Sequence, residues 1–473
     1  MIDKTLTRND LLFAVGCALF YAVAVLVVPP YTPLIEPDSE VYIAFNAFRP
    51  ALYPAFLAVG RALGLDLIAI TWVQLALFCA ALVFFLLALL RAGFTKTLLA
   101  LLVAVLAANV LFSSFHRAIL TESISFSLAL VALAGWIEYL RSGRVAWLAV
   151  AGLALGLMLG FRLAGLGIVP LHALAVWVKK PQRFARASAL VIALVPVALG
   201  VGAERALHYA VHGGGHPSQA PYLLTGKAAL LVKPDMKFSG PHAAALGDLA
   251  HKLYDIYAPM QRTLAAAPSW PVKVQLSAAY EASAQYPVLV KEIDEAAQRE
   301  GTTAAVLRSA LGRQVIWQNL PGYLELTLLN QLGQWSVAAQ NFPAVARGLA
   351  AYADANPGIV GLGGFGAAAL HPPATRLGTV VYPAFLLAGA VTFVLALGFL
   401  AFLLRPSLSD SPAGFYLLVA AYLSAMCHAY TLLISLINVW TPRFLMAVFP
   451  HLAIIGLCLI LAFLTRHRPP ART

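Results

Sequence analysis

The chain has 473 residues, of which 61% are hydrophobic and only 11% are charged. Because a soluble domain carries about 25% charged residues, this composition excludes an ordinary soluble protein and indicates a chain that crosses a membrane several times. The formal net charge of +12 does not indicate a nucleic-acid-binding protein, since most basic residues stand in short links between apolar stretches, where membrane orientation accounts for them.

Apolar stretches long enough to cross about 30 Å of hydrocarbon as helices recur along the chain. Their continuous apolar runs favour helices over a β-barrel, whose strands alternate apolar and polar residues. We predict ten spans, at residues 10–29, 66–90, 97–115, 118–140, 145–161, 164–178, 187–207, 377–404, 414–437 and 443–465. The first is expected to be a retained anchor, because it is long and lacks a small-residue cleavage site.

The basic residues between these spans predict the orientation of the chain, because cytoplasmic loops carry an excess of Lys and Arg. With ten spans, the basic links all fall on one side: Lys4, Arg8, Arg91, Lys96, Arg141, Arg144, Lys179, Lys180, Arg183, Arg186, Arg405, Arg466, Arg468 and Arg472. Both termini are therefore expected in the cytoplasm.

The first outward loop, residues 30–65, carries two acids close together, Asp38 and Glu40. Ionised groups beside hydrocarbon are costly, so they are candidates for function. Side chains two residues apart project together only in an extended segment. Such a pair can hold a divalent cation or supply a general base. The alternative is a solvated loop in which both carboxylates remain hydrated.

Two other parts of this loop are predicted to be helical. Apolar residues recur at helical spacing in two pieces, Val41, Phe45 and Phe48 in the first and Leu52, Phe56, Leu57 and Leu63 in the second. Both pieces are expected to lie along the membrane interface, broken at Pro50 and Pro54.

Charged residues also stand at the outward end of the fourth span. Glu122 is predicted slightly inside the membrane, and the alternative is capping, with Thr121 as N-cap and Glu122 favoured by the helix dipole. Capping leaves the preceding His116 and Arg117 unexplained, which favours a site.

Three further arginines on the predicted outward side need either an anionic partner or a side-chain position that reaches the aqueous interface. Arg162 lies in an apolar run, where a guanidinium needs an anion or a carboxylate unless it snorkels to the headgroups. Arg443, at the outer end of the last span, is unusual under the positive-inside rule, and phosphate binding would account for it. Arg49, between the two loop helices, has the same two alternatives of phosphate binding and snorkelling.

Residues 208–376 are the only stretch long enough for a soluble domain. They are rich in Ala, Leu, Gln and Glu, with helical periodicity and no convincing strand alternation, so we expect a mainly helical outward domain. The predicted domains are 1–207, 208–376 and 377–473.

Two motif-like strings are set aside. His208, His212 and His216 are spaced as metal ligands on a helix, but the glycines at 213–215 break that helix. The string Gly361-Leu362-Gly363-Gly364-Phe365-Gly366 matches a dinucleotide-binding pattern, but no strand precedes it.

With these residues in place, the chain resembles the GT-C-fold glycosyltransferases, membrane enzymes that take a sugar from a polyprenyl-phosphate donor. The protein O-mannosyltransferases and the lipid A aminoarabinose transferases are members. The resemblance rests on four strings in this order: the acidic pair with Tyr42 and then Arg49-Pro50 and Tyr53-Pro54-Ala55-Phe56-Leu57; Arg117-Ala118-Ile119-Leu120-Thr121-Glu122-Ser123; Gly152, Gly156 and Arg162; and Thr441-Pro442-Arg443-Phe444. The segment 208–376 resembles no family.

The resemblance implies a GT-C-like all-α polytopic bundle of about ten transmembrane helices, with interfacial helices in the first outward loop and a mainly helical periplasmic domain. It implies an inverting transfer to a periplasmic glycan, lipid or protein, with the protein in a bacterial inner membrane. Asp38 and Glu40 are the expected catalytic residues. The residues expected to bind the donor phosphate or substrate are Tyr42, Arg49, Tyr53, His116, Arg117, Glu122, Arg162 and Arg443.

One departure bears on cofactors. The family often carries Asp-Asp, Asp-Glu or Asp-x-Asp in the first loop, and this chain has Asp38-Ser39-Glu40. This leaves open whether a divalent cation such as Mg²⁺ or Mn²⁺ is used, with Asp38 and Glu40 as its ligands.

Two other function classes compete with an enzyme. A transporter or flippase of lipid-linked glycans usually places charges at mid-membrane and shows repeated halves. A non-catalytic membrane scaffold would not need the outward acids. Here the polar residues gather at one face and no repeat is visible, which favours the transferase.

Overall fold

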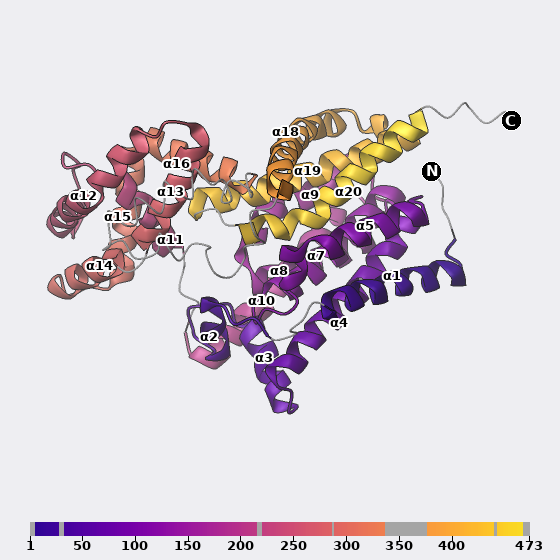
Figure 1. Ribbon diagram of the computed structural model, residues 1–473, viewed down its shortest axis with the longest axis horizontal. Helices are drawn as coiled ribbons and strands as arrows, with labels where there is room; N and C mark the ends of the chain where they lie inside the picture. Colours follow the sequence, from indigo (N-terminus) through magenta and orange to yellow (C-terminus); the bar gives the residue numbers. More distant parts are fainter. Residues whose placement is uncertain are drawn as a thin grey trace. The chain divides into compact units, whose positions relative to one another are not determined.

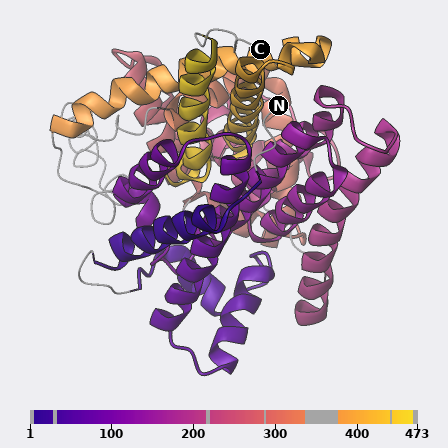
Figure 2. The same cartoon turned by 90° about the vertical axis from the view of Figure 1, so that its right-hand side faces the viewer.

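The computed structural model describes residues 5–27, 33–214, 220–285, 288–335, 376–438 and 442–466. Within these ranges the chain is almost entirely helical, as Figures 1 and 2 show, and the β-type pairing among them is one isolated bridge between Leu34 and Ala118. For the residues that the structure describes, the prediction of an all-α fold is confirmed.

The chain divides into two compact units. The first unit comprises Met1–Pro217, Ala390–Tyr430 and Met446–Thr473, and the second comprises Ser218–Gly389 and Thr431–Leu445. The second unit therefore holds most of the predicted segment 208–376, together with about half of one apolar helix and the end turns of two others.

Every apolar stretch predicted as a span contains helix, in the order α1 (Arg8–Leu26), α4 (Leu67–Arg91), α5 (Lys96–Ala108) with α6 (Val110–Ser114), α7 (Glu122–Ser142), α8 (Val145–Phe161), η1 (Leu163–Ile168) with α9 (Val169–Val178), α10 (Arg186–His212), α18 (Arg376–Leu404), α19 (Pro412–Ile437) and α20 (Pro442–Arg466). Among the described residues, 7 helices are long and apolar enough to cross a membrane. The helices at 96–108, 145–161 and 163–178 are apolar but shorter. The chain thus has the character of a multi-pass membrane protein.

Helix α7 is the centre of the first unit. In its most apolar window 89% of the residues are buried inside the protein, against 28% for α1 and for α10. Helices α8 and α10 approach each other closely because glycines face the contact, and a Cβ on Gly156 would lie 2.5 Å from the carbonyl oxygen of Val197.

The loop between α1 and α4 contains two short helices, α2 (Pro37–Ile43) and α3 (Leu52–Ala62). The first ends earlier than predicted, because Phe45 adopts a φ of 51° and turns the chain, so Phe48 is not on the helix. The predicted break at Pro54 is wrong. Pro54 stands in the first turn of α3, where a missing N–H costs no helical hydrogen bond.

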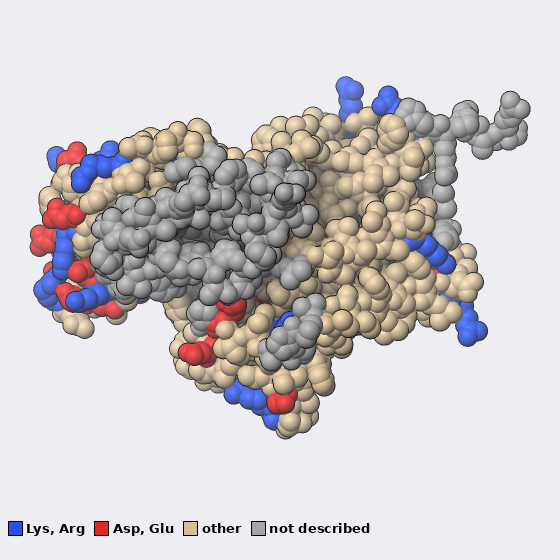
Figure 3. All heavy atoms as spheres, in the orientation of Figure 1, with Lys and Arg blue, Asp and Glu red and all other residues tan. Residues whose placement is uncertain are grey.

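The second unit contains α11 (Ala220–Leu231), α12 (Ala243–Ala265), α13 (Trp270–Gln285), α14 (Val288–Arg299), α15 (Ala304–Gln318) and α16 (Leu320–Gln334), packed around one hydrophobic core. Its core also contains an ion pair, with the Lys227 Nζ 3.0 Å from Glu281 Oε2. Figure 3 shows acidic and basic side chains gathered over α12 and α14, whereas the visible face of the first unit has a broad uncharged surface.

Candidate functional site

Backbone pairing joins two loops that are far apart in the sequence. The Leu34 N–H donates to the Arg117 carbonyl at 2.8 Å, and the Ile119 N–H donates to the Leu34 carbonyl at 3.1 Å. The segment that leads into α2 therefore lies beside the segment that leads into α7. The candidate residues of both loops are brought together by this contact.

Asp38 and Arg49 form the first ion pair of the site. Asp38 stands in the first turn of α2, where Pro37 suits the start of a helix. The Arg49 Nη2 donates to Asp38 Oδ1 at 2.5 Å, and its guanidinium lies 5.4 Å from the centre of the Tyr42 ring. The Asp38 side chain keeps 25% of its surface exposed and Arg49 keeps 19%, so both can be reached from outside.

Glu40 does not join this pair. Since α2 is helical rather than extended, side chains two residues apart do not project together, and Glu40 is exposed. Asp38 and Glu40 therefore do not fit a two-carboxylate cation site. No group of three or more His, Cys, Asp or Glu side chains gathers to hold a metal ion within the described ranges.

Tyr53 lies at the centre of the site and is fully buried. Its ring meets the Tyr42 ring edge-on at 5.2 Å, and its hydroxyl donates to Gln74 Oε1 at 2.7 Å. The Gln74 Nε2 then donates to the Ala118 carbonyl at 3.1 Å. Burial raises the pKa of Tyr53 well above its ordinary value, and the nearby Glu122 and Tyr42 raise it further, so Tyr53 stays a neutral donor.

Glu122 and Arg162 form the second ion pair. The Arg162 Nη1 donates to Glu122 Oε1 at 2.7 Å, with 12% of the Arg162 side chain and 2% of the Glu122 side chain exposed. Arg162 thus has the carboxylate partner that its apolar surroundings require and does not snorkel. Thr121 occupies the N-cap position of α7 but makes no side-chain capping bond, whereas Glu122 stands in the first turn, where the helix dipole favours an acid.

His116 has a structural role in this geometry. It is fully buried, with Nε2 2.9 Å from the Tyr21 hydroxyl and Nδ1 2.8 Å from the Ser123 hydroxyl. Burial lowers the pKa of His116 to about 3, so the ring is neutral at physiological pH. It joins α1 to the start of α7. Arg117 is partly buried, and its carbonyl accepts the Leu34 bond.

Two residues that the sequence did not single out for this site hold the first loop on α10. The Ala51 N–H, at the start of α3, donates to Glu204 Oε1 at 3.0 Å. The His208 Nε2 donates to the Ala47 carbonyl at 2.9 Å, which gives His208 a role in positioning the loop. His216, the third residue of the histidine spacing, lies outside the described residues.

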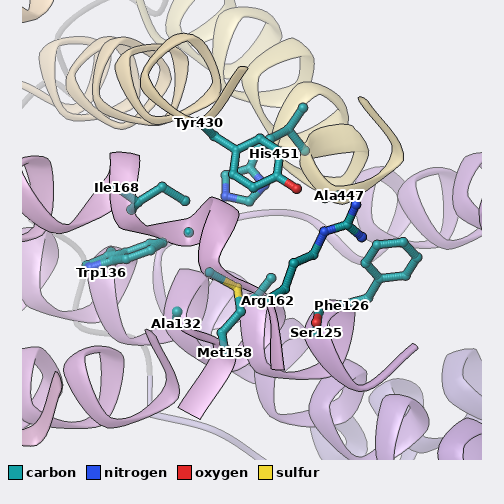
Figure 4. Close-up of a pocket in the computed structure, with 13 residues that line it drawn as sticks. Ser125, Phe126, Ala132, Trp136, Met158, Arg162, Ile168, Tyr430, Ala447 and His451 are labelled. Carbon is teal, nitrogen blue, oxygen red and sulfur yellow. The ribbon is translucent and has the colours of Figure 1, made fainter. Parts of the chain in front are cut away.

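A small cavity of about 20 Å³ opens beside Arg162, large enough for one water molecule. Figure 4 shows Tyr430 and His451 reaching it from α19 and α20, and Ser125 and Arg162 reaching it from the α7 and α8 side. His451 is 2% exposed, and neither of its ring nitrogens has a hydrogen-bond partner in the part of the chain that is described. His451 was not among the site residues predicted from the sequence.

The structure therefore brings together Asp38, Tyr42, Arg49, Tyr53, His116, Glu122 and Arg162. Arg443 stands in the first turn of α20, but its side chain lies outside what the structure describes. Comparison of the chain with protein-family models, with curated proteins and with solved structures found no match.

Proposed function

We propose that this chain is an inverting membrane glycosyltransferase that moves a sugar from a polyprenyl-phosphate donor to an acceptor on the periplasmic side, a glycan, a lipid or a protein. The observation that carries the proposal is the convergence of two acid–arginine pairs, Asp38–Arg49 and Glu122–Arg162, on the buried Tyr53. Such a grouping supplies both a carboxylate and phosphate-binding donors in one place.

The reaction needs a base and an anion site. Asp38 takes the proton of the acceptor hydroxyl, whose oxygen attacks the anomeric carbon of the donor sugar. The bond from that carbon to the phosphate oxygen breaks, its electron pair leaves with the phosphate, and one direct displacement inverts the anomeric centre. Arginine stabilises the charge that develops on the phosphate.

Arg49 suits this phosphate role. Its Nε is buried and has no hydrogen-bond partner among the described residues, so this charged donor would gain an acceptor if a phosphate bound beside it. When Arg49 moves from Asp38 to the phosphate, the carboxylate of Asp38 becomes available as the base. Arg162 supports the same phosphate from the end of α8, and Glu122 fixes its position.

The membrane topology is part of the proposal. We count the three shorter apolar helices as spans, which gives ten spans, cytoplasmic termini and a site on the periplasmic side of a bacterial inner membrane. Helix α8 has 17 residues, or about 26 Å at 1.5 Å per residue, which is close to the hydrocarbon thickness.

A transporter or flippase of lipid-linked glycans is the second candidate. His451 and Ser125, both buried among apolar helices without hydrogen-bond partners in the described chain, favour it, because polar groups inside a bundle often mark a transport path.

One experiment separates the two functions. The purified chain in nanodiscs is given polyprenyl-phosphate sugars together with a membrane extract as acceptor source, and release of free polyprenyl phosphate is measured. A transferase consumes the donor and labels the acceptor. A flippase leaves the donor intact but moves it across the bilayer of a proteoliposome, and that result would overturn the proposal.

A further inference from the structure

Helix α16 presents a row of exposed leucines. Leu320, Leu324, Leu328 and Leu332 follow one another at intervals of four, so they share one face of the helix. They are 38%, 53%, 49% and 38% exposed. A contiguous apolar face on the surface marks an interaction site, because water-facing surfaces rarely carry one. We refer to these four residues as the leucine stripe.

The uncharged polar side chains of α16 point into the protein instead. The Asn330 Nδ2 donates to the buried Glu281 Oε2 at 2.8 Å. The Gln331 Nε2 donates to the Thr431 hydroxyl at 3.0 Å. A surface helix in water has the opposite arrangement, with polar residues outward. The acid of α16, Glu325, is paired with Lys273.

These inward contacts tie α16 to the ends of two candidate membrane spans. Thr431 lies near the end of α19, and the Tyr323 hydroxyl donates to the Leu436 carbonyl at 2.8 Å in the last turn of the same helix. At the other end of α16, a Cβ on Gly389 of α18 would lie 3.1 Å from the Trp335 ring. Helix α16 therefore packs where α19 ends and where the apolar part of α18 begins.

The two spans that α16 contacts carry exposed leucines of their own. Leu387 of α18 is 65% exposed, and Leu432 of α19 is 46% exposed. Residues of a membrane span that face outward contact lipid, so the helix that carries the leucine stripe packs against two spans whose exposed leucines have the chemistry of a lipid contact.

We propose that α16 is an interfacial helix whose leucine stripe contacts the acyl chains of the bilayer at the level where α19 ends. Its apolar face sits about 5–10 Å into the boundary between headgroups and acyl chains, as amphipathic helices do. The second unit is thereby anchored in the membrane through α16 as well as through the spans. This anchoring is independent of which reaction the first unit catalyses.

Spin labelling tests the proposal on the full chain in nanodiscs. A nitroxide is attached at Leu324→Cys or Leu328→Cys after replacement of the four native cysteines, and its relaxation by oxygen is compared with that by a water-soluble nickel chelate. Val306→Cys on α15 is the matched control, because Val306 is 45% exposed but lies off the stripe.

The labels at 324 and 328 are expected to respond more to oxygen than to nickel, and the label at 306 more to nickel. Stronger nickel access at 324 and 328 would mean that the stripe faces water. Protection from both reagents would mean that protein covers it, whether another segment or a second copy. Either result overturns the proposal.

A second pair of variants serves if the cysteine variants do not fold. Leu328→Asp should lower the melting temperature of the protein in nanodiscs, whereas Val306→Asp should leave it nearly unchanged, because only the first places a charge among acyl chains. Equal shifts for the two variants would contradict lipid contact.

Discussion

The Asp38–Arg49 pair of the first unit and the Lys227–Glu281 pair of the second unit are both ion pairs, but they differ in solvent exposure. In the first unit, Asp38 and Arg49 keep 25% and 19% of their side chains exposed. In the second unit, Lys227 and Glu281 are both 0% exposed, and Asn330 adds a third polar group. Under the proposed function the open pair exchanges its partner for a substrate, whereas the sealed pair only holds helices together. Burial therefore separates a candidate reaction centre from a structural contact made of the same kind of groups.

The largest expected effect is on catalysis at the open pair. Asp38→Asn keeps the size of the side chain but removes the base, so transfer should fall by about 10²–10⁴-fold, the usual contribution of a general base. The measurement is donor consumption by the purified protein in nanodiscs. Asp235→Asn is the control, because Asp235 is an exposed acid of the second unit. Near-normal turnover by Asp38→Asn would remove Asp38 from the mechanism. Glu40→Gln is expected to cause a smaller loss.

At the buried Lys227–Glu281 pair we expect substitutions to change stability and not catalysis. Lys227→Met leaves the Glu281 carboxylate buried without its cation, which costs about 3–5 kcal/mol of unfolding free energy. Lys227→Met combined with Glu281→Gln should recover most of that loss, because neither group is then charged. Thermal unfolding of the single and double variants checks this. Activity per folded molecule should not change, and a specific loss of activity would contradict a purely structural role.

A substitution that preserves the charge tests the role of the Glu122–Arg162 pair. Arg162→Lys keeps the positive charge but loses the planar fork that can hold both Glu122 and a phosphate. It should weaken the use of the lipid donor by about 1.5–3 kcal/mol, the value of a hydrogen bond to a charged group. Arg443→Lys is expected to act in the same direction. The dependence of rate on donor concentration measures both, and an unchanged dependence for Arg162→Lys would assign Arg162 to structure alone.

The smallest effect concerns pH. Because the pKa of His116 is lowered to about 3 in the folded chain, the unfolded chain binds the additional proton first as the pH falls below about 6.5. The stability that neutral His116 contributes is therefore present above about pH 6.5 and is lost progressively below it, by at most about 1.4 kcal/mol per pH unit until pH 3. Stability at pH 7.5 and pH 5.5 should differ less in His116→Gln than in the wild type. His251→Gln, at an exposed position, should keep the wild-type difference.

The apolar helices could be predicted from the sequence because a continuous apolar run leaves a chain few alternatives in lipid. Interruptions within the apolar helices and turns in the neighbouring loops were harder to predict. Asn109 interrupts the third apolar stretch by accepting a bond from the Phe112 N–H, which starts α6. Phe45 turns the first loop through a positive φ that a bulky residue seldom adopts. Both depend on local geometry that hydrophobic periodicity does not encode.

For the site, the sequence indicated several of the residues but not their pairing. Arg162 was expected to need an anion or a carboxylate, but Glu122 lies 40 positions earlier, and only the folded chain joins them. Glu204 is 153 positions from its partner Ala51. Gln74 could have been predicted as a site residue from its place in a long apolar run. An amide there must find hydrogen-bond partners within the protein. His451 is likewise a polar residue in a long apolar run and could have been singled out for the same reason.

The central claim is that the two acid–arginine pairs form one site for a lipid phosphate. The most direct measurement is an electron cryomicroscopy map of the Asp38→Asn protein in nanodiscs with a polyprenyl-phosphate sugar bound. We expect phosphate density within hydrogen-bonding distance of Arg49 or Arg162, with the sugar on the side of residue 38. Donor density elsewhere on the protein, with its phosphate away from both Arg49 and Arg162, would contradict this site.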